Sequence, residues 1–444
     1  MISKYIPVIG MEIHVELKTR SKMFCGCIND PFGAGKPNIY TCPVCLGLPG
    51  ALPVPNKKAV DWTILLGLSL GCTVNDESKF DRKHYFYPDL PKGYQISQYD
   101  IPLCRNGVVH MTSGDVRVHR VHLEEDTGKL LHTTIDGKPV TLVDFNRSGV
   151  PLMEIVTEPD IRSSQQAKEF LKKLHQVIRY LNISDADMEK GSMRLEPNIS
   201  VQKIGVTSLP QYKVEVKNIN SFNFVKRAID YEIDRQIGIL DKGEIPVQET
   251  RGWDEDKGKT VSQRSKEEAH DYRYFPEPDI PPMKFTESQI SKLKTQIPEL
   301  PQYKRERFIK TFDLSEYDVD QLIYEPETAR YFEDCIKYLV SSIKVKTITP
   351  KMIANWIINK KGDINFTPAQ FVDQIIKTST IENVADDVLQ TAIQSVIAAN
   401  SKAVSDYKSG KQQALMFLFG NVLKELNGKG DKKKIMEMVL ARVR

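Results

Sequence analysis

Four cysteines near the start of the chain limit its possible folds more than any other feature of the sequence. They form two close pairs, Cys25 with Cys27 and Cys42 with Cys45, and fourteen residues separate the pairs. Two thiolate pairs across a loop can close a tetrahedral Zn(II) site. Because four sulfur ligands leave no open position, the pattern predicts a structural zinc site that folds this loop. Free buried thiols are the alternative interpretation.

The other cysteines and the first residues bear on the cellular compartment. Cys72, Cys104 and Cys335 lack paired spacing and are predicted to be small apolar core residues. No run of about eighteen apolar residues occurs, and residues 1–8 lack the charged start and apolar core of a secretory signal. We therefore expect a cytoplasmic protein without a membrane segment and without a disulfide framework.

Length and charge bound the number of domains and the range of partners. A chain of 444 residues exceeds one ordinary core and favours roughly two to four domains. The net charge of +4 permits a polyanionic partner but does not by itself indicate nucleic acid. Residues 401–444 hold ten Lys and Arg against four Asp and Glu. Lys429 and Lys432 to Lys434 could meet a phosphate backbone, although a solvated helix face explains them equally well.

The spacing of apolar residues changes along the chain and predicts an α+β fold. Residues 6–161 contain short β-like runs between turn residues. Two amphipathic helices follow, one starting at a capping box formed by Ser163 and Gln166 and one after Ser221. Four prolines within residues 276–282 mark the edge of this region, and helical patterns continue beyond it.

Acidic residues recur in several of the β-like runs. Alternation along one strand sends Glu12, His14 and Glu16 to the same face. Carboxylate oxygens suit a hard divalent cation, and an imidazole can complete or orient such a site. A solvated polar strand face is the more common explanation of this pattern.

Glu154 is the acid that most strongly suggests a site. It lies inside the apolar run from Leu152 to Val156, so we expect it to be partly buried and to need a cation or a proton. A structural salt bridge with an Arg is the alternative. Two further acidic segments are His122 to Asp126 and the alternating residues Arg194, Glu196 and Asn198.

Three cationic or titratable residues stand beside three aromatic residues in residues 81–88, which read Asp-Arg-Lys-His-Tyr-Phe-Tyr-Pro. This composition suits phosphate contact and stacking on a base or ribose, and a surface loop without a ligand explains it nearly as well. A known phosphate-binding loop is excluded, because Trp253 stands where a P-loop ending in Gly258-Lys259-Thr260 requires its first Gly.

Taken together, these segments resemble the GatB family, which is one component of the aspartyl/glutamyl-tRNA amidotransferases. Residues 401–430 resemble the small helical YqeY-like tail of the same family, so the resemblance spans nearly the whole chain. The other segments that carry it are residues 8–17, 42–50, 80–98, 122–129, 146–160, 188–200, 214–222 and 250–282.

The resemblance implies a domain order. It implies a cradle-like mixed-sheet catalytic domain with the zinc-binding loop over residues 1–290 and a helical domain over residues 291–370. A YqeY-like helical tail domain that binds tRNA would follow over residues 371–444. The family also implies a heterotrimeric complex, in which the partners are an amidase subunit plus a small third subunit.

The activity of the family implies a division of labour. The amidase releases ammonia from glutamine, and the GatB component uses ATP and Mg(II) to phosphorylate the side-chain carboxylate of misacylated Glu-tRNA(Gln) or Asp-tRNA(Asn). Ammonia then displaces phosphate. The chain would therefore be the kinase and transamidase subunit of a glutamine-hydrolysing, ATP-dependent carbon–nitrogen ligase of protein biosynthesis.

The resemblance also implies roles for particular residues. Glu124 is kept as an expected ligand beside Glu125, because strand register cannot be fixed from sequence. In one departure, many family members have an Asp where this chain has Glu196, which is one methylene longer. The expected magnesium ligands are Glu12, His14, Glu124, Glu125, Glu154 and Glu196. The expected catalytic residues are Glu12, His14, Lys83, Glu125, Glu154 and Glu196, and the expected ATP contacts are Arg82, Lys83 and Tyr85.

Two other functions compete with this interpretation. A non-catalytic zinc-ribbon RNA-binding protein of the translation apparatus would explain the cysteines and the basic tail, but would leave Glu12, Glu154 and Glu196 without a purpose. A stand-alone ligase would need its own source of ammonia, and no Cys or Ser-Lys constellation for glutamine hydrolysis is evident. We therefore expect ammonia to arrive from a partner.

Overall fold

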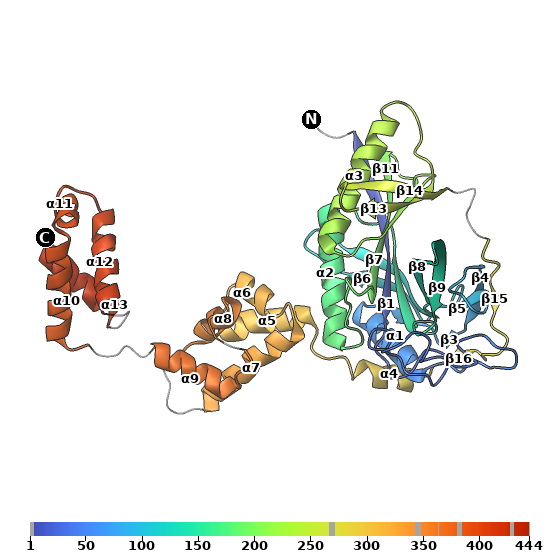
Figure 1. Cartoon of the computed structure of the whole chain (residues 1–444), viewed down its shortest axis with the longest axis horizontal. Coiled ribbons are helices and arrows are strands. Elements are labelled where there is room, and N and C mark those ends of the chain that lie inside the picture. Colours follow the sequence, from blue (N-terminus) through green and yellow to red (C-terminus); the bar gives the residue numbers. More distant parts are fainter. Residues whose placement is uncertain are drawn as a thin grey trace. The chain divides into compact units, whose positions relative to one another are not determined.

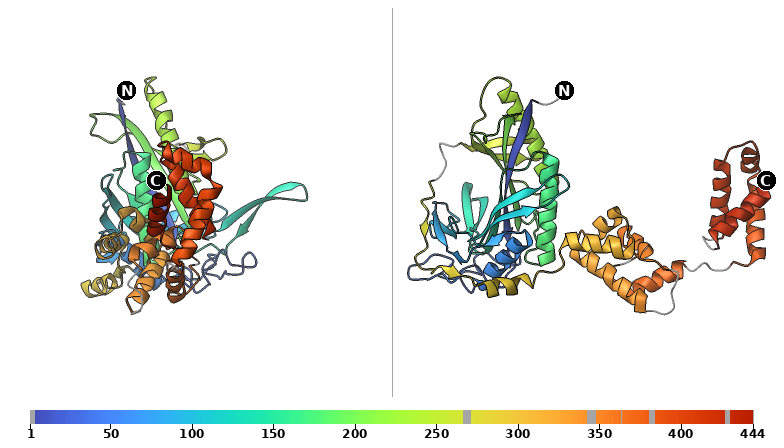
Figure 2. Two further views of the ribbon diagram at one scale, coloured as in Figure 1. Left: turned by 90° about the vertical axis from the view of Figure 1, so that its left-hand side faces the viewer. Right: turned by 180° about the vertical axis from the view of Figure 1, so that it is seen from behind.

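The computed structural model describes residues 4–265, 271–341, 348–362, 364–379, 384–426 and 430–443. The chain divides into two compact units, Met1–Glu306 with Tyr324–Pro326 and Arg307–Ile323 with Glu327–Arg444 (Figure 1). Sheets and helices build the first unit, and helices build the second (Figure 2). The predicted α+β class is thereby confirmed.

A nine-stranded sheet forms the centre of the first unit. In the order of pairing its strands are β14 (Lys259–Ser265), β13 (Glu249–Asp254), β12 (Val214–Lys217), β11 (Met193–Lys203), β1 (Tyr5–Glu16), β10 (Pro151–Thr157), β7 (Val116–Glu125), β6 (Cys104–Val109) and β2 (Thr73–Val74). Neighbouring strands run antiparallel, except that β12 and β13 are parallel. β1 lies in the middle, so both of its edges are paired.

The two faces of β1 differ because successive side chains point to opposite sides of a sheet. Ile9, Met11, Ile13 and Val15 are buried in one large core that also holds apolar residues of α2 (Ser164–Leu181) and α3 (Phe222–Leu240). Figure 1 shows these two helices lying beside the sheet. The intervening residues, including Glu12, therefore point away from this core.

The predicted helix starts occur where the sequence placed them. Ser163 accepts a hydrogen bond from the backbone N of Gln166 (3.1 Å), and Ser221 accepts one from Phe224 N (3.1 Å). The capping box is only half formed, because the side chain of Gln166 accepts from Arg162 N instead of Ser163 N. The remaining helices of this unit are α1 (Lys57–Ser69) and α4 (Glu287–Lys294), and α5 (Pro301–Phe312) continues into the second unit.

Three small sheets complete the first unit. One has the order β15 (Phe275–Pro276), β4 (Asp81–His84) and β5 (Tyr94–Ser97), and another pairs β16 (Met283–Lys284) with β3 (Glu77–Ser78). The third is a hairpin of β8 (Lys129–Ile135) and β9 (Lys138–Asp144). Its turn has positive φ at Asp136 (50°) and Gly137 (75°), which is the backbone that an Asp-Gly pair favours in a two-residue hairpin loop.

The second unit contains two separate hydrophobic clusters. One includes Phe308, Phe332 and Phe371, and the other includes Leu418 and Val439. The helices are α6 (Glu316–Leu322), α7 (Pro326–Ser341), α8 (Pro350–Ile358), α9 (Pro368–Ser379), α10 (Asp386–Ala399), α11 (Ser401–Lys408), α12 (Gln413–Glu425) and α13 (Lys432–Val443). Across the described residues, no helix combines the length and the apolarity needed to cross a bilayer.

Candidate functional site

Strand register brings the predicted acids together on one face of the large sheet. His14 of β1 lies opposite Glu154 of β10, and Glu12 lies opposite Glu196 of β11. Glu154 in turn lies opposite His122 of β7. Residues that are more than a hundred positions apart in sequence therefore meet because four neighbouring strands align them.

A first cluster consists of His14, Glu124 and Glu154. Nε2 of His14 lies 3.3 Å from Oε2 of Glu154 and 3.8 Å from Oε1 of Glu124. His122 approaches the same oxygen of Glu154, with its Nε2 at 3.1 Å. Glu124 and Glu154 are buried, and Ser97 donates a hydrogen bond to Glu124 (3.0 Å). We call His14, Glu124 and Glu154 the histidine–glutamate cluster.

The charges of this cluster strongly perturb its titration. Burial opposes ionisation of Glu154, yet His122 and His14 hold the pKa of that carboxyl well below its ordinary value. Burial also opposes protonation of His14, but the charges of Glu154 and its neighbours outweigh it and raise the pKa of His14 to about 9. The site therefore concentrates negative charge that a cation can balance.

A second cluster consists of Glu12, Glu196 and Glu215, which we call the glutamate cluster. Its three carboxylates come within 4.8 Å of one another. Asn198 donates to Glu12 (3.0 Å), and Lys217 donates to Glu196 (2.9 Å). Burial and the charge of Glu154 raise the pKa of Glu12. Lys217 helps to lower the pKa of Glu196 against the effect of burial.

Glu215 is a member of this cluster that sequence reasoning missed. Its signal is the alternation in β12, where Val214 and Val216 are buried and Glu215 and Lys217 point to the other face. Only four residues form this strand, so the pattern is too short to recognise without its neighbours. Thr250 on the adjacent strand donates a hydrogen bond to Glu215 (2.9 Å).

One cavity of about 390 Å³ is lined by His14 and Glu154 of the histidine–glutamate cluster and by all three members of the glutamate cluster. Lys83, Tyr272 and Tyr274 line it as well, together with Lys213 and Lys217. Carboxylates, cations and aromatic rings thus surround a single space. Of the residues predicted to be catalytic, the cavity brings together Glu12, His14, Lys83, Glu154 and Glu196.

Glu124 and Glu125 point in opposite directions from β7. The carboxylate of Glu124 faces His14, whereas that of Glu125 pairs with Lys92 (2.6 Å) and accepts a hydrogen bond from Ile96 N (3.0 Å). Glu125 lines a separate small cavity beside Cys45. Its position outside the histidine–glutamate cluster follows from the period of two along a strand.

Arg82 and Lys83 diverge in the same way. Lys83 enters the cavity, where its Nζ lies 5.0 Å from the ring centroid of Tyr272. Burial opposes its charge, but nearby carboxylates such as Glu124 raise the pKa of Lys83. Arg82 is turned away and donates two hydrogen bonds to Glu277 (2.7 and 2.8 Å). Arg82 does not line this cavity, and its expected contact with ATP stays a prediction.

Tyr85 lies beside the cavity wall. Its ring contacts Tyr272 edge-on at 5.9 Å between centroids. Burial raises the pKa of Tyr85, so its hydroxyl stays protonated near neutral pH.

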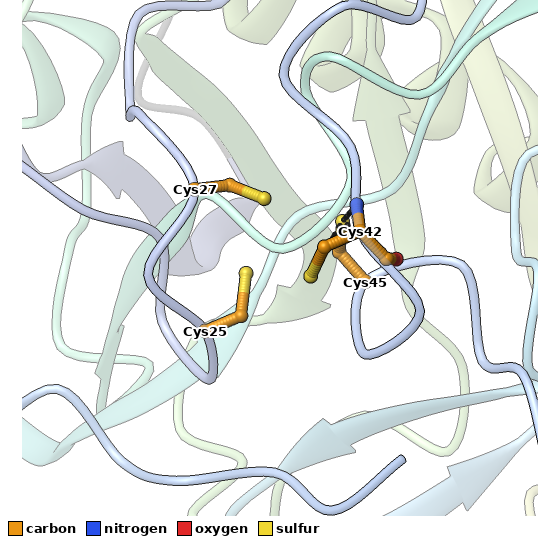
Figure 3. Close-up of side chains that lie close together, drawn as sticks. All are labelled: Cys25, Cys27, Cys42 and Cys45. Carbon is orange, nitrogen blue, oxygen red and sulfur yellow. Dashed lines mark hydrogen bonds between the residues drawn. The ribbon is translucent and has the colours of Figure 1, made fainter.

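The four clustered cysteines lie together on loops next to this sheet. Sulfur atoms of Cys25, Cys27, Cys42 and Cys45 all lie within 4.8 Å of one another, and Figure 3 shows them converging from two loop segments. A hydrogen bond from Cys25 lowers the pKa of Cys45 to about 5. Four thiols at this spacing fit the tetrahedral ligand set of a structural zinc ion. Cys72, Cys104 and Cys335 are buried apart from this cluster.

The predicted basic segment of the tail is only partly described. Lys432, Lys433 and Lys434 are exposed in the first turn of α13, and Lys434 pairs with Asp386 (2.5 Å). Lys429 lies outside the described residues.

The donor set of the large cavity fits a hard divalent cation. Carboxylate oxygens are the ligands that Mg(II) prefers, and each cluster offers at least two. Among the residues that the structure describes, Nδ1 of His14 and Nδ1 of His122 are buried without a hydrogen-bond partner. The Nε2 atoms of the same two rings are the ones that face the carboxylates.

Comparisons with known proteins agree with this architecture. Residues 7–291 match the family described as the GatB/GatE catalytic domain, and residues 327–443 match the GatB domain family. The chain is 44% identical to the B subunit of the aspartyl/glutamyl-tRNA(Asn/Gln) amidotransferase of Caldicellulosiruptor bescii, over 98% of each chain. The corresponding protein of Thermoanaerobacter sp. (strain X514) is 44% identical over 96% of this chain and 97% of its own. That of Thermosipho melanesiensis is 43% identical over 98% of each.

The fold, the site and the family matches show a protein with an α+β catalytic domain of the GatB/GatE type and a helical GatB domain. Similarity over nearly the full length then makes the assignment specific. The chain belongs to the GatB family, the B subunits of the aspartyl/glutamyl-tRNA(Asn/Gln) amidotransferases. The resemblance inferred from the sequence is confirmed.

Proposed function

We propose that this chain is the activating subunit of a tRNA-dependent amidotransferase. It phosphorylates the side-chain carboxylate of Glu-tRNA(Gln) or Asp-tRNA(Asn) with ATP, and ammonia then reacts with the phosphorylated carboxylate to form the amide. The observation that carries the proposal is the convergence of two carboxylate clusters and Lys83 on one cavity. The names of its relatives, which are B subunits of aspartyl/glutamyl-tRNA(Asn/Gln) amidotransferases, support the amidation part of this reaction.

The proposed chemistry needs this combination of charges. A carboxylate is a poor electrophile, because loss of oxide from it is very unfavourable. In the first step the bond between the γ-phosphorus and ADP breaks, and a bond forms from a carboxylate oxygen to phosphorus. In the second step ammonia attacks the carbonyl carbon, phosphate leaves with the electron pair of the carbon–oxygen bond, and the nitrogen loses a proton. Charge neutralisation and alignment dominate such a phosphoryl transfer.

Residues of the chain divide this work. The histidine–glutamate cluster and the glutamate cluster would hold Mg(II), which when bound neutralises charge on the phosphate oxygens. Lys83 carries a fixed positive charge into the same cavity and would contact the transferring phosphate. His122 holds Glu154 in place through the 3.1 Å contact. Tyr85 supports Tyr272 at the edge of the cavity.

The domain limits and the partners remain part of the proposal. The expected limits at residues 290 and 370 fall inside α4 and α9, and Phe371 of α9 packs with Phe308 and Phe332. We therefore assign the chain through α4 to the catalytic cradle, the helices through α9 to a helical domain, and the helices from α10 onward to the tail that binds tRNA. A partner amidase would release ammonia from glutamine, and a small third subunit would complete a cytoplasmic heterotrimer. The thiols of the four-cysteine cluster would hold zinc and so fix the loop on which Cys45 lies next to Gly149.

One assay tests the proposed reaction. The purified chain is incubated with Glu-tRNA(Gln), ATP and Mg(II), with either ammonium or glutamine, and with or without the partner amidase. We expect ammonium to support amidation without the amidase and glutamine to support it only with the amidase. If ATP is never hydrolysed in a tRNA-dependent way, the proposed reaction is wrong and only a role in RNA binding is left.

A further inference from the structure

Two tyrosines from distant parts of the chain form a stacked pair at the edge of the large cavity. The rings of Tyr99 and Tyr274 are nearly parallel, with 11° between their planes and 4.3 Å between their centroids. Tyr274 lines the cavity, and Tyr99 is 52% exposed. A stack of this kind inside a core would be ordinary packing, but here aromatic surface stays open beside a polar cavity.

Two hydrogen bonds fix the backbone of Tyr99. Its N donates to the carboxylate of Asp81 (3.0 Å), which is 1% exposed, and its carbonyl accepts from Arg120 (3.3 Å). Arg120 also lines the cavity. The backbone of Tyr99 is therefore held by contacts that do not involve its hydroxyl, and its ring stacks on Tyr274.

The segment that carries Tyr274 is fastened independently. The carbonyl of Tyr272 accepts from His84 N (2.9 Å), and the ring of Phe275 stacks on His84 with 5.0 Å between centroids. Arg82 secures the next residues through its paired hydrogen bonds to Glu277, whose side chain is fully buried. A rigid support of this sort is what a preformed binding surface requires.

A positive charge lies next to the pair. The ring of Tyr272 contacts that of Tyr274 edge-on at 6.1 Å, and Lys83 lies over Tyr272 at 5.0 Å. Lys83 borders the cavity that is lined by His14, Glu154 and the glutamate cluster. The stacked rings are therefore one side chain away from the cation that would meet phosphate.

We propose that Tyr99 and Tyr274 form a stacking platform for an adenine base. The inference rests on the proposed function, because both substrates of that reaction carry adenine: ATP itself, and the terminal adenosine to which the amino acid is esterified. Proteins commonly hold the unstacked bases of single-stranded RNA ends on aromatic rings. A base on this platform would keep its phosphate or its esterified amino acid close to Lys83 and the carboxylate clusters.

Substitutions that remove or keep the aromatic rings of Tyr99 and Tyr274 separate the effect of stacking from other effects. Tyr99→Leu and Tyr274→Leu remove the aromatic face, and Tyr99→Phe and Tyr274→Phe keep it. KM for ATP and KM for Glu-tRNA(Gln) are measured separately in the assembled complex with glutamine. We expect the Leu variants to raise one of the two KM values by roughly 5- to 100-fold and the Phe variants to change it less than about threefold. Tyr303→Leu, at an exposed position of α5, is the matched control.

The KM value that rises shows whether the adenine on the platform belongs to ATP or to the tRNA. A rise for ATP alone assigns the platform to the nucleotide, and a rise for tRNA alone assigns it to the terminal adenosine. A tRNA ending in 2-aminopurine gives a second readout, since stacking on tyrosine quenches its fluorescence in the wild type and in the Phe variants.

The outcomes that would overturn the platform are equally definite. If the Leu variants change neither KM, or raise both KM values equally, the proposed stacking platform is wrong. If Tyr274→Leu does not fold, the half-exposed Tyr99 still provides the test. If the proposed function itself is wrong, even the wild-type complex shows no tRNA-dependent ATP hydrolysis. That outcome is distinct from the ones above, in which the wild type is active.

Discussion

His14 and Glu154 lie directly opposite each other on adjacent strands, and their Nε2 and Oε2 atoms are 3.3 Å apart. The contact is lateral, between two strands whose register is fixed along five residue pairs. The register fixes the face on which both side chains stand, because a slip by one residue would turn every side chain to the other face. The geometry of the histidine–glutamate cluster is therefore set by the sheet.

Replacing Glu154 by Gln should abolish activation of the carboxylate. The substitution keeps the size of the side chain but removes a charge that His14 and His122 hold ionised. We expect kcat for tRNA-dependent ATP hydrolysis to fall by roughly 10²- to 10³-fold, as for other groups that stabilise a transition-state charge. Binding of tRNA, measured by filter retention, should stay within about threefold. Equal losses of both would instead indicate a structural role.

A matched control exists near the end of the same sheet. Glu158 pairs with His119 (2.8 Å) at a partly exposed site outside the cavity. Glu158→Gln removes the same charge from a similar pair, so it should leave ATP hydrolysis essentially unchanged.

The neighbouring acids Glu124 and Glu125 should respond differently to the same substitution. Glu124→Gln removes a carboxylate that faces His14, so we expect a fall in tRNA-dependent ATP hydrolysis of roughly 10²-fold. Glu125→Gln removes the partner of Lys92 instead and should change this rate only a few-fold. Single-turnover measurement of ADP release compares the two variants directly. The opposite order of effects would mean that the metal site uses the other face of β7.

The sequence predicts which residues of one strand share a face, and it predicts this for each strand separately. Alternation correctly places Glu12 and His14 on one face, because the period of two is a property of the backbone. Alternation does not say which strands are neighbours. For that reason the sequence does not reveal Glu215, and it cannot separate Glu124 from Glu125 without the pairing of β7 with β10.

Of the two neighbouring cations expected to contact ATP, only one lines the cavity, because adjacent residues of a strand point in opposite directions. Composition treats Arg82 and Lys83 as equivalent cations, yet only Lys83 reaches the cavity. Arg82 faces Glu277, which is nearly two hundred residues away in sequence and lies in the proline-rich segment. A long-range ion pair of this kind leaves no local pattern from which it could be read.

Zinc content tests the four-cysteine cluster. Protein kept reduced should contain about one zinc per chain, and Cys45→Ser should lower this content and the melting temperature together, because the metal folds the loop. Cys72→Ala, at a buried position outside the cluster, should keep its zinc. Metal analysis by mass spectrometry gives the ratio. Less than about half an equivalent in the wild type would contradict coordination by four thiolates.

Glu16 should make stability depend on pH in a direction that its burial dictates. It lies on the same face of β1 as His14, but it contacts Asp126 and Arg194 and not the cavity. Burial and the charge of Asp126 raise the pKa of Glu16 to about 8 in the folded protein, from an ordinary value of 4.5. Between these two pH values the folded state holds a proton that the unfolded state has released.

The proton that the folded state retains on Glu16 determines how the free energy of unfolding changes with pH. The contribution of Glu16 to the free energy of unfolding is complete below pH 4.5 and is lost as pH rises through 8. Glu16→Gln mimics the protonated form at every pH, so relative to the wild type it should gain about 1–3 kcal/mol between pH 5 and pH 9. Urea unfolding at both pH values measures this difference, with the exposed Glu287→Gln as the control for loss of one negative charge. A variant whose stability relative to the wild type is the same at both pH values would show that Glu16 is ionised in the folded protein, with Arg194 balancing both carboxylates.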